Sequence, residues 1–297
     1  MAASLLSLQC YGQPPVDSLT VTFTGDVLLV RGVRDRISHL GPDILFSPSI
    51  DSLFSASDFV VGNLVCPATT IHLPNFKKYI FRAEPEWLEC LRRHGFTHLN
   101  LANNHSIDQG RKGLMDTRNN ISAAGIIPFG ADTTMAAASQ PLLLTDFPRP
   151  VFVLPSLRVA LENFPYLPSS PSPSQEPFDS LIQRVAGLRF LHPQSVIIVT
   201  LHWGAEHTLR PAPQQRIQAH ALIDAGADIL ICHHTHTLQS IERYEDRYIY
   251  YSIGNFIFDQ KRDINSRAAA VQLVITTDTL QVRTIPIRIE DCTPVIP

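Results

Sequence analysis

The sequence predicts an α/β fold, and two patterns support this prediction. Apolar runs of strand length alternate with stretches of helical character through the first two thirds of the 297-residue chain. The last third is instead rich in β-type segments, which predicts a second sheet packed on the first. The chain has 24 basic and 27 acidic residues, and this near-neutral balance argues against a protein built mainly to bind nucleic acid or anionic membrane.

The elements follow from these patterns in chain order. Apolar runs predict strands at Leu19–Thr24, Phe59–Gly62, His98–Leu101, Val151–Leu154, Val196–Leu201 and Asp228–Cys232. Each predicted helix is followed by a glycine, where a helix C-cap belongs, and these helices are Glu84–His94, Gly110–Ala124 and Gln214–Ala225. Thr277-Asp278 is expected to form a hairpin turn within the β-rich last third, where strands are expected at Tyr248–Tyr251, Ala269–Thr276 and Leu280–Ile287.

We expect a single domain over residues 19–297, preceded by a flexible N-terminus at residues 1–18. The alternative for that apolar start, which lacks a basic region, is the remnant of a trimmed signal or lipoprotein leader. The Pro/Ser-rich segment at residues 165–177 is expected to be a stiff surface excursion, with an inter-domain hinge as the alternative. No apolar run reaches the roughly 18 residues of a membrane helix. Five scattered cysteines without a CxxC pair argue against a disulfide framework or a thiolate zinc knuckle.

Polar residues collect where the predicted strands end, which is where open α/β sheets place their sites. Asp26 follows the first strand and can present a carboxylate to a metal or phosphate, although an ordinary turn explains it equally. After HLNLA, Asn104 can offer an amide oxygen to a hard cation, and His105 can act as a general acid. Asp108 can fix the tautomer of His105. The alternative for this segment is an Asx turn followed by a helix N-cap.

Histidines follow two later strands. His202 comes after VIIVTL and can bind a metal, and Glu206 is the only carboxylate near it. His234 and His236 follow DILI at positions i and i+2 of a loop, which places both imidazoles on one side as metal ligation requires, although buried structural histidines are the alternative. The segment Tyr251–Asp259 is expected to shape the core and the wall of the site. The remaining histidines are interpreted as surface or core residues: His39, His72, His94, His98, His192 and His220.

Taken together, these segments resemble the CapA family of bacterial capsule synthesis proteins. The similarity runs from about Val21 to Asp259 and rests on GDVLL, GNL, LANNHSIDQG, LHWGAEH, GADILICHHTH and YSIGNFIFD, in that order. The family is linked to poly-γ-glutamate capsules and has a fold similar to calcineurin-like metallophosphoesterases. The resemblance therefore implies a four-layer α/β/β/α sandwich of the metallo-dependent phosphatase type.

The same resemblance implies a set of site residues. Metal ligation is implied for Asp26, Asn63, Asn104, His202, His234 and His236, and catalytic roles for His105, Asp108 and Glu206. The implied cofactor is one or two divalent ions of Mn, Zn or Fe, which would activate water and hold a phosphoryl or carbonyl oxygen.

The sequence departs from the patterns of these families at four positions. Leu28 stands where metallophosphoesterases have a histidine, and Asn63 stands where they have a bridging aspartate. Val65 replaces the glutamate of a GNLE motif, and Cys232 replaces a glycine. Because Asp26 is then the one anionic ligand, one metal or a weakened site is expected rather than a tightly bound pair.

Three functions fit these observations. The first is a metal-dependent hydrolase or transferase that acts on a phosphoester or on an amide or ester of an envelope polymer. The second is a non-catalytic scaffold that works with other subunits of a capsule polymer synthesis or export machine. The third is a cytosolic phosphatase unrelated to capsules. The resemblance implies the outer face of the cytoplasmic membrane, whereas the lack of a clear leader or anchor leaves the cytoplasm open.

Overall fold

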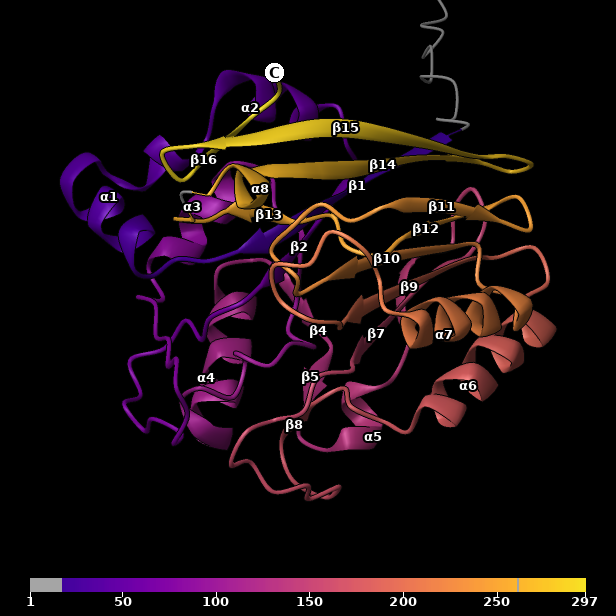
Figure 1. The fold of residues 1–297 in the computed structure, drawn as a ribbon, viewed down its shortest axis with the longest axis horizontal. Coiled ribbons are helices and arrows are strands. Elements are labelled where there is room, and N and C mark those ends of the chain that lie inside the picture. Colours follow the sequence, from indigo (N-terminus) through magenta and orange to yellow (C-terminus); the bar gives the residue numbers. More distant parts are fainter. Residues whose placement is uncertain (1–17, 261) are drawn as a thin grey trace, which may run out of the picture.

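Two β-sheets form the centre of the fold in the computed structural model, which describes residues 18–260 and 262–297 (Figure 1). The predicted flexible N-terminus therefore lies outside the described residues, apart from Ser18, which begins the first strand. The first sheet has eight strands in the order β16-β15-β14-β1-β2-β3-β4, with β13 paired to β1. Its strands are β1 (Ser18–Val27), β2 (Phe59–Leu64), β3 (His98–Asn100), β4 (Ile127–Phe129), β13 (Asn255–Ile257), β14 (Arg267–Thr276), β15 (Leu280–Glu290) and β16 (Thr293–Val295).

The second sheet has six strands in the order β11-β12-β10-β9-β7-β6. They are β6 (Leu142–Thr145), β7 (Val151–Leu157), β9 (Val196–His202), β10 (Ile229–His233), β11 (Ile241–Tyr244) and β12 (Arg247–Tyr250). A separate two-stranded sheet joins β5 (Ala131–Asp132) to β8 (Ser172–Pro173). The helical elements are α1 (Gly32–Leu40), η1 (Pro42–Leu45, a 3₁₀ helix), α2 (Pro48–Ser55), α3 (Trp87–Arg93), α4 (Gly110–Ala123), α5 (Met135–Ala138), α6 (Phe178–Leu191), α7 (Pro213–Asp224) and α8 (Asp263–Ser266).

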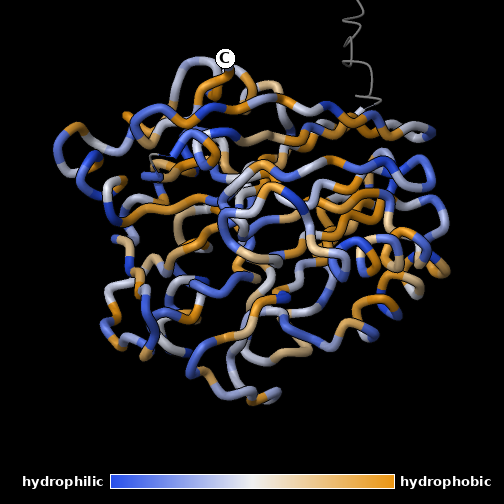
Figure 2. The backbone as a smooth tube through the Cα atoms, viewed as in Figure 1, coloured by the Kyte–Doolittle hydropathy of each residue, from blue (hydrophilic) through white to orange (hydrophobic). Residues whose placement is uncertain are grey.

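Three apolar clusters hold these elements together. One joins the first sheet to α1, α2, α3 and α4, a second fills the space between the two sheets, and a third joins the second sheet to α6 and α7. Figure 2 shows the strands of the second sheet mostly in hydrophobic colours and many outer loops in hydrophilic ones. Strands buried on both faces are expected to be continuously apolar, as β9 and β10 are. The predicted α/β class is confirmed.

The structure corrects the predicted composition of the two sheets. The β-rich last third does not build a second sheet of its own. Instead β14, β15 and β16 extend the first sheet, because β14 pairs antiparallel with β1. The second sheet starts at β6, and of the strands beyond residue 240 it contains only β11 and β12. The predicted hairpin is confirmed, since β14 and β15 pair antiparallel across Thr277-Asp278.

Several element boundaries also differ, and two of these differences have local reasons. Helix α3 begins at Trp87 rather than Glu84, because Glu84 precedes a proline and that position disfavours the helical conformation. Strand β1 continues to Val27 rather than ending at Thr24, because β13 pairs with it at Asp26 and Val27. Asp26 is therefore a strand residue and not the first residue of a turn.

The Pro/Ser-rich segment does not stay at the surface throughout. Ser172 and Ser174 are buried, and the Ser174 hydroxyl donates to the carbonyl oxygen of Pro155 at 2.7 Å. Strand β8 thereby attaches this segment to β5. Among residues 18–260 and 262–297, no helix is both long and apolar enough to span a bilayer.

His98 makes the stability of the fold sensitive to acid. It is buried in β3, and burial lowers its pKa from 6.5 to about 4. Below pH 6.5 the unfolded chain binds a proton that folded His98 rejects, so stability falls as the pH falls from 6.5 to about 4. We expect His98 alone to contribute about 3 kcal/mol to this loss. Denaturant unfolding at pH 7 and pH 4.5 should show a smaller pH difference for His98→Asn than for wild type. An equal pH difference in both proteins would contradict this role.

Candidate metal-binding cleft

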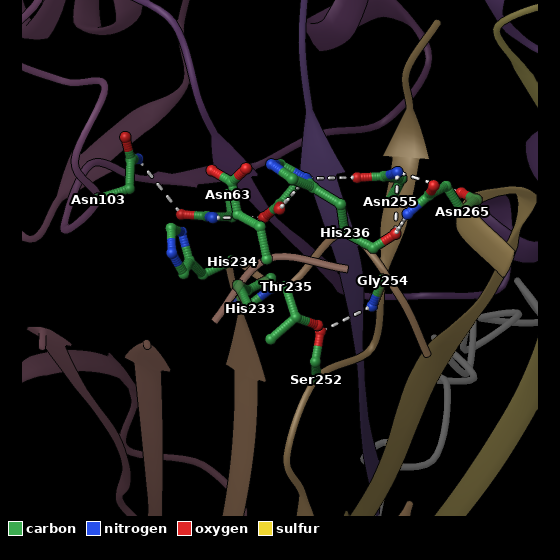
Figure 3. A network of polar contacts seen from close by, with 12 residues as sticks. Asn63, Asn103, His233, His234, Thr235, His236, Ser252, Gly254, Asn255 and Asn265 are labelled. Atoms are coloured by element: carbon green, nitrogen blue, oxygen red, sulfur yellow. Dashed lines mark hydrogen bonds and ion pairs between the residues drawn. The ribbon is translucent and has the colours of Figure 1, made fainter. Parts of the chain in front are cut away.

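The ends of five strands bring the polar residues of the site together. In the first sheet, Asp26 of β1 lies beside Asn63 of β2 on one side and Asn255 of β13 on the other. In the second sheet, His202 ends β9 and is paired with His233 at the end of β10. Both sheets therefore contribute side chains to one polar network (Figure 3).

Asp26 is the centre of the first part of this network. Its Oδ1 accepts a hydrogen bond from Asn63 Nδ2 at 2.7 Å, and its Oδ2 lies 3.3 Å from His236 Nδ1. The same His236 nitrogen lies 2.9 Å from Asn255 Oδ1. Burial would raise the pKa of Asp26, but the hydrogen bond with His236 and the charges of nearby histidines outweigh it and hold the pKa well below its usual range. Burial would lower the pKa of His236, but its hydrogen bond with Asp26 and the charge of Asp26 more than reverse this and raise the pKa.

Three ligand-type atoms converge in the second part of the network. His202 Nε2 lies 2.9 Å from Asn104 Oδ1 and 3.1 Å from His234 Nδ1. The other nitrogen of His202, Nδ1, lies 3.2 Å from Asn63 Nδ2, and the neutral ring carries at most one hydrogen at Nε2. One hydrogen cannot serve both Asn104 and His234. A divalent cation at this point would instead be held by all three atoms, and these donor types suit Zn, Mn or Fe.

Burial keeps the histidines of this cluster neutral. It lowers the pKa of His202 well below 6.5, and the neighbouring His234 lowers it further. Burial and His236 lower the pKa of His234 to about 4. Neutral imidazoles have the lone pairs that metal ligation requires. The residues therefore fit the metal that the sequence resemblance implies.

His105 and Asp108 form a second buried pair at the edge of the cluster. His105 Nδ1 lies 2.9 Å from Asp108 Oδ2, and the two residues lie in the turns before α4 rather than within a helix. Lys77 places its Nζ 2.5 Å from Asp108 Oδ1, and the ring of Phe81 stacks on His105 with centroids 4.4 Å apart. Burial lowers the pKa of His105, and Asp108 opposes this only in part.

Sequence reasoning did not find Lys77 or the supporting asparagines. Lys77 lies in an irregular loop whose residues follow no strand or helix periodicity, so no pattern pointed to it. Asn103 donates to the carbonyl oxygen of Leu64 at 2.8 Å, and Asn265 donates to that of His236 at 2.7 Å. Asn255 was expected to shape the wall of the site. In the structure its side chain contacts His236 directly.

A cleft opens onto this cluster. One part has a volume of about 390 Å³ and is lined by His105, His236 and Glu206 together with Arg31 and Val65. An adjoining part of about 310 Å³ shares His105 and Glu206 and is lined further by Lys77, Lys78, Asn104 and His234. Glu206 is 44% exposed at its side chain, so it faces the opening rather than the buried ligand cluster. The cleft therefore offers a carboxylate and several cationic groups around the imidazoles.

The loop after β10 owes its shape to an unusual backbone. His234 and His236 both have positive φ angles, 97° and 57°, a region that side chains other than glycine rarely adopt. This conformation turns His234 toward His202 and His236 toward Asp26. Strained backbone of this kind is concentrated at functional sites.

Comparison with known proteins identifies the family. Residues 20–260 match the family model described as "Bacterial capsule synthesis protein PGA_cap". The chain belongs to this capsule synthesis family. The match covers all nine predicted site residues, from Asp26 to His236, and confirms the resemblance to CapA proteins.

Individual relatives of this capsule synthesis family cover most of the chain. "Capsule biosynthesis protein CapA" of Bacillus anthracis is 29% identical, over 94% of this chain and 69% of that protein. "PGA biosynthesis protein CapA" of Bacillus subtilis is 30% identical, over 94% of this chain and 73% of that protein. A "Probable polyglutamine synthesis accessory protein" of Mycobacterium tuberculosis is 29% identical, over 82% and 75%. The crystal structure of TT1561 of Thermus thermophilus gives a TM-score of 0.44 at 8% identity, over 90% of this chain and 98% of that one.

Proposed function

We propose that this capsule synthesis family member is a metal-dependent hydrolase or transferase that acts on a poly-γ-glutamate type of envelope polymer, or on a phosphoester formed during its synthesis. The convergence of Asn104 Oδ1, His202 Nε2 and His234 Nδ1 carries this proposal. A shared cation would satisfy these three atoms better than hydrogen bonds among them do. Asp26, Asn63 and His236 complete the proposed ligand set. The arrangement of helices outside two packed sheets supports a four-layer α/β/β/α sandwich of the metallo-dependent phosphatase type.

The chain's own residues supply the proton transfer in this proposal. A bound cation would supply Lewis acidity toward a phosphoryl or carbonyl oxygen. Asp108 holds Nδ1 of His105, which leaves Nε2 of His105 for the cleft. Because the ring is neutral, His105 first takes a proton from the attacking nucleophile and then returns it to the leaving group. Lys77 balances the charge of Asp108, and Glu206 lies at the opening.

Charge also favours a second candidate function. Asp26 is the one carboxylate among the six proposed ligands, and it is already paired with His236. A cluster with so little negative charge suits an accessory subunit that keeps the fold and binds metal weakly. The printed description of the Mycobacterium tuberculosis relative as an accessory protein agrees with this candidate.

Metal analysis of the purified chain tests the proposal. We expect His234→Ala with His236→Ala to lower bound Mn, Zn or Fe by about one equivalent per chain, because this removes two ligands. The measurement is elemental analysis after equilibration with each ion, with circular dichroism to show that the variant is folded. His39→Ala, at an exposed histidine of α1, is the matched control and should leave the metal content unchanged.

The outcomes separate the candidates. Unchanged metal content in the folded double variant would overturn the proposed site. Metal binding with turnover of poly-γ-glutamate, γ-glutamyl peptides or generic phosphoesters supports the enzyme. Metal binding without turnover of any of them favours the accessory role.

A further inference from the structure

A second group of ligand-type side chains lies where η1, α2 and α3 meet. Asp43 of η1, Cys90 of α3 and His94, which follows α3, place one ligand atom each within 4.8 Å of one another. None of the three lines either part of the cleft. From the sequence alone, His94 was expected to be a surface or core histidine outside any cluster. The structure corrects this, because the partners of His94 come from two other elements.

The distances within this group are close to those of a metal site. His94 Nε2 lies 3.0 Å from Asp43 Oδ1, and Cys90 Sγ lies 3.5 Å from the same oxygen. In a tetrahedral zinc site, ligand atoms are about 3.3–3.6 Å apart, as follows from the usual Zn–N and Zn–S bond lengths. Cys90 and His94 are four residues apart, so one turn of helix brings them to the same face.

His94 is also held in the orientation that metal binding needs. Its other ring nitrogen, Nδ1, lies 2.7 Å from Asp51 Oδ1, and its ring stacks on Phe46 at 4.0 Å between centroids. Metal-binding histidines almost always donate their second N–H to a carboxylate, carbonyl or water, which fixes the tautomer. With Nδ1–H donated to Asp51, Nε2 turns its lone pair toward Asp43 Oδ1 at 3.0 Å, a contact that needs a cation or a second ring proton between the two atoms.

Charge explains what a cation would change. Asp43 and Asp51 carry two negative charges, and Arg93 pairs with Asp43. Counting His94 as neutral, and Cys90 as a thiol because burial raises its pKa to about 12, the charges of Asp43, Asp51 and Arg93 sum to −1 without a cation. A divalent cation that deprotonates Cys90 brings the net charge to zero.

We propose that Asp43, Cys90 and His94 bind one divalent cation of the zinc class, with water as a further ligand. The mixed set of sulfur, nitrogen and oxygen donors suits Zn²⁺ or Co²⁺ and disfavours Mg²⁺ and Ca²⁺, which take oxygen ligands. The bound ion would join η1 to α3, two elements whose apolar residues pack in the same cluster on the first sheet. This site is independent of the cleft and of the function proposed for it.

Cobalt titration of the full chain tests this site. A thiolate bound to Co²⁺ gives a charge-transfer band in the near ultraviolet. The residues proposed for the cleft include no cysteine, so the cleft cannot give this band. We expect the wild-type chain to show this band and Cys90→Ser to lose it. Asp51→Asn should bind cobalt roughly 10- to 100-fold more weakly, the range for loss of an outer partner of a metal-bound histidine. Arg93→Gln should bind it more tightly, because Arg93 competes for Asp43.

Control variants assign the band to this site. Cys10→Ser and Cys292→Ser should keep it, and so should the folded His234→Ala, His236→Ala variant, which removes only the cleft ligands. Circular dichroism establishes that Cys90→Ser is folded, and Asp51→Asn provides a second test that leaves the thiol in place. The absence of a band in wild type, or an equal band in Cys90→Ser, would overturn the proposal.

Discussion

Replacing His105 by asparagine is expected to lower turnover by roughly 100-fold or more, the loss typical of removing a general acid–base group. The amide of asparagine fills part of the same space but cannot exchange a proton near neutral pH. Metal content and melting temperature should stay near those of wild type, because none of the proposed ligand atoms belongs to His105. The measurement is kcat with metal added, on whichever polymer, γ-glutamyl peptide or phosphoester the wild type turns over.

The matched control is the same substitution at His39, which is exposed on α1 and should leave kcat unchanged. Asp108→Asn is a poorer probe of this pair than His105→Asn. It would leave Lys77 buried without its carboxylate partner, and breaking a buried ion pair costs about 3–5 kcal/mol. An active wild type matched in kcat by His105→Asn would show that this histidine is structural.

Replacing Gly25 by alanine is expected to destabilise the fold by about 3 kcal/mol or more, at the upper end of the cost of overpacking. A Cβ at Gly25 would lie 2.3 Å from the carbonyl oxygen of Gly254 and 2.8 Å from the carbonyl carbon of Asn255. Both are backbone atoms and cannot rotate away, so β1 and β13 must separate. Because Asp26 and Asn255 are neighbours across these two strands, metal binding in the cleft should weaken as well.

Gly187→Ala is the matched control for Gly25→Ala. Gly187 lies within α6, and an added Cβ there meets no atom within 4 Å. Alanine is favoured over glycine in a helix by about 0.5–1 kcal/mol, so this variant should be slightly more stable than wild type. Urea unfolding of the three proteins checks both expectations. Equal stability of Gly25→Ala and wild type would show that β1 and β13 are not packed as closely as described.

The sequence was most informative where local pattern and burial agree. The strands β9 and β10 are buried on both faces and are mostly apolar up to the histidines that end them, so VIIVTL and DILI predicted them closely. Helix α6 was not predicted, because it contains Gly187 and exposes Phe190 and Leu191 to solvent, which obscures its apolar face. The local sequence pattern of a strand does not determine its pairing partner. For this reason the sheet that contains β14, β15 and β16 was predicted wrongly.

The candidate site was likewise predicted in part, where its residues lie at strand ends, and missed where they lie in irregular loops. Five of the predicted site residues lie at or just after strand ends: Asp26, Asn104, His202, His234 and His236. The rule that sites lie at strand ends was therefore sufficient to predict that they lie close together. The contact of Lys77 with Asp108 depends on how an irregular loop folds back over α4. The group of Asp43, Cys90 and His94 depends on the packing of η1 against α3. Neither arrangement has a signature in a single sequence, because each joins residues from separate elements.

The position of β1 has a consequence for how the protein folds as it is made. This strand comes first in the described chain, yet it pairs with β14 near the other end, and Gln272 donates to Thr22 across 250 residues of sequence. A ribosome must therefore synthesise the chain as far as Thr276 before β14 can complete its pairing with β1. Until then β1 has an unpaired edge, and such long-range pairing makes folding slow and nascent chains prone to aggregation. Expression at low temperature or with added chaperones should accordingly raise the soluble yield.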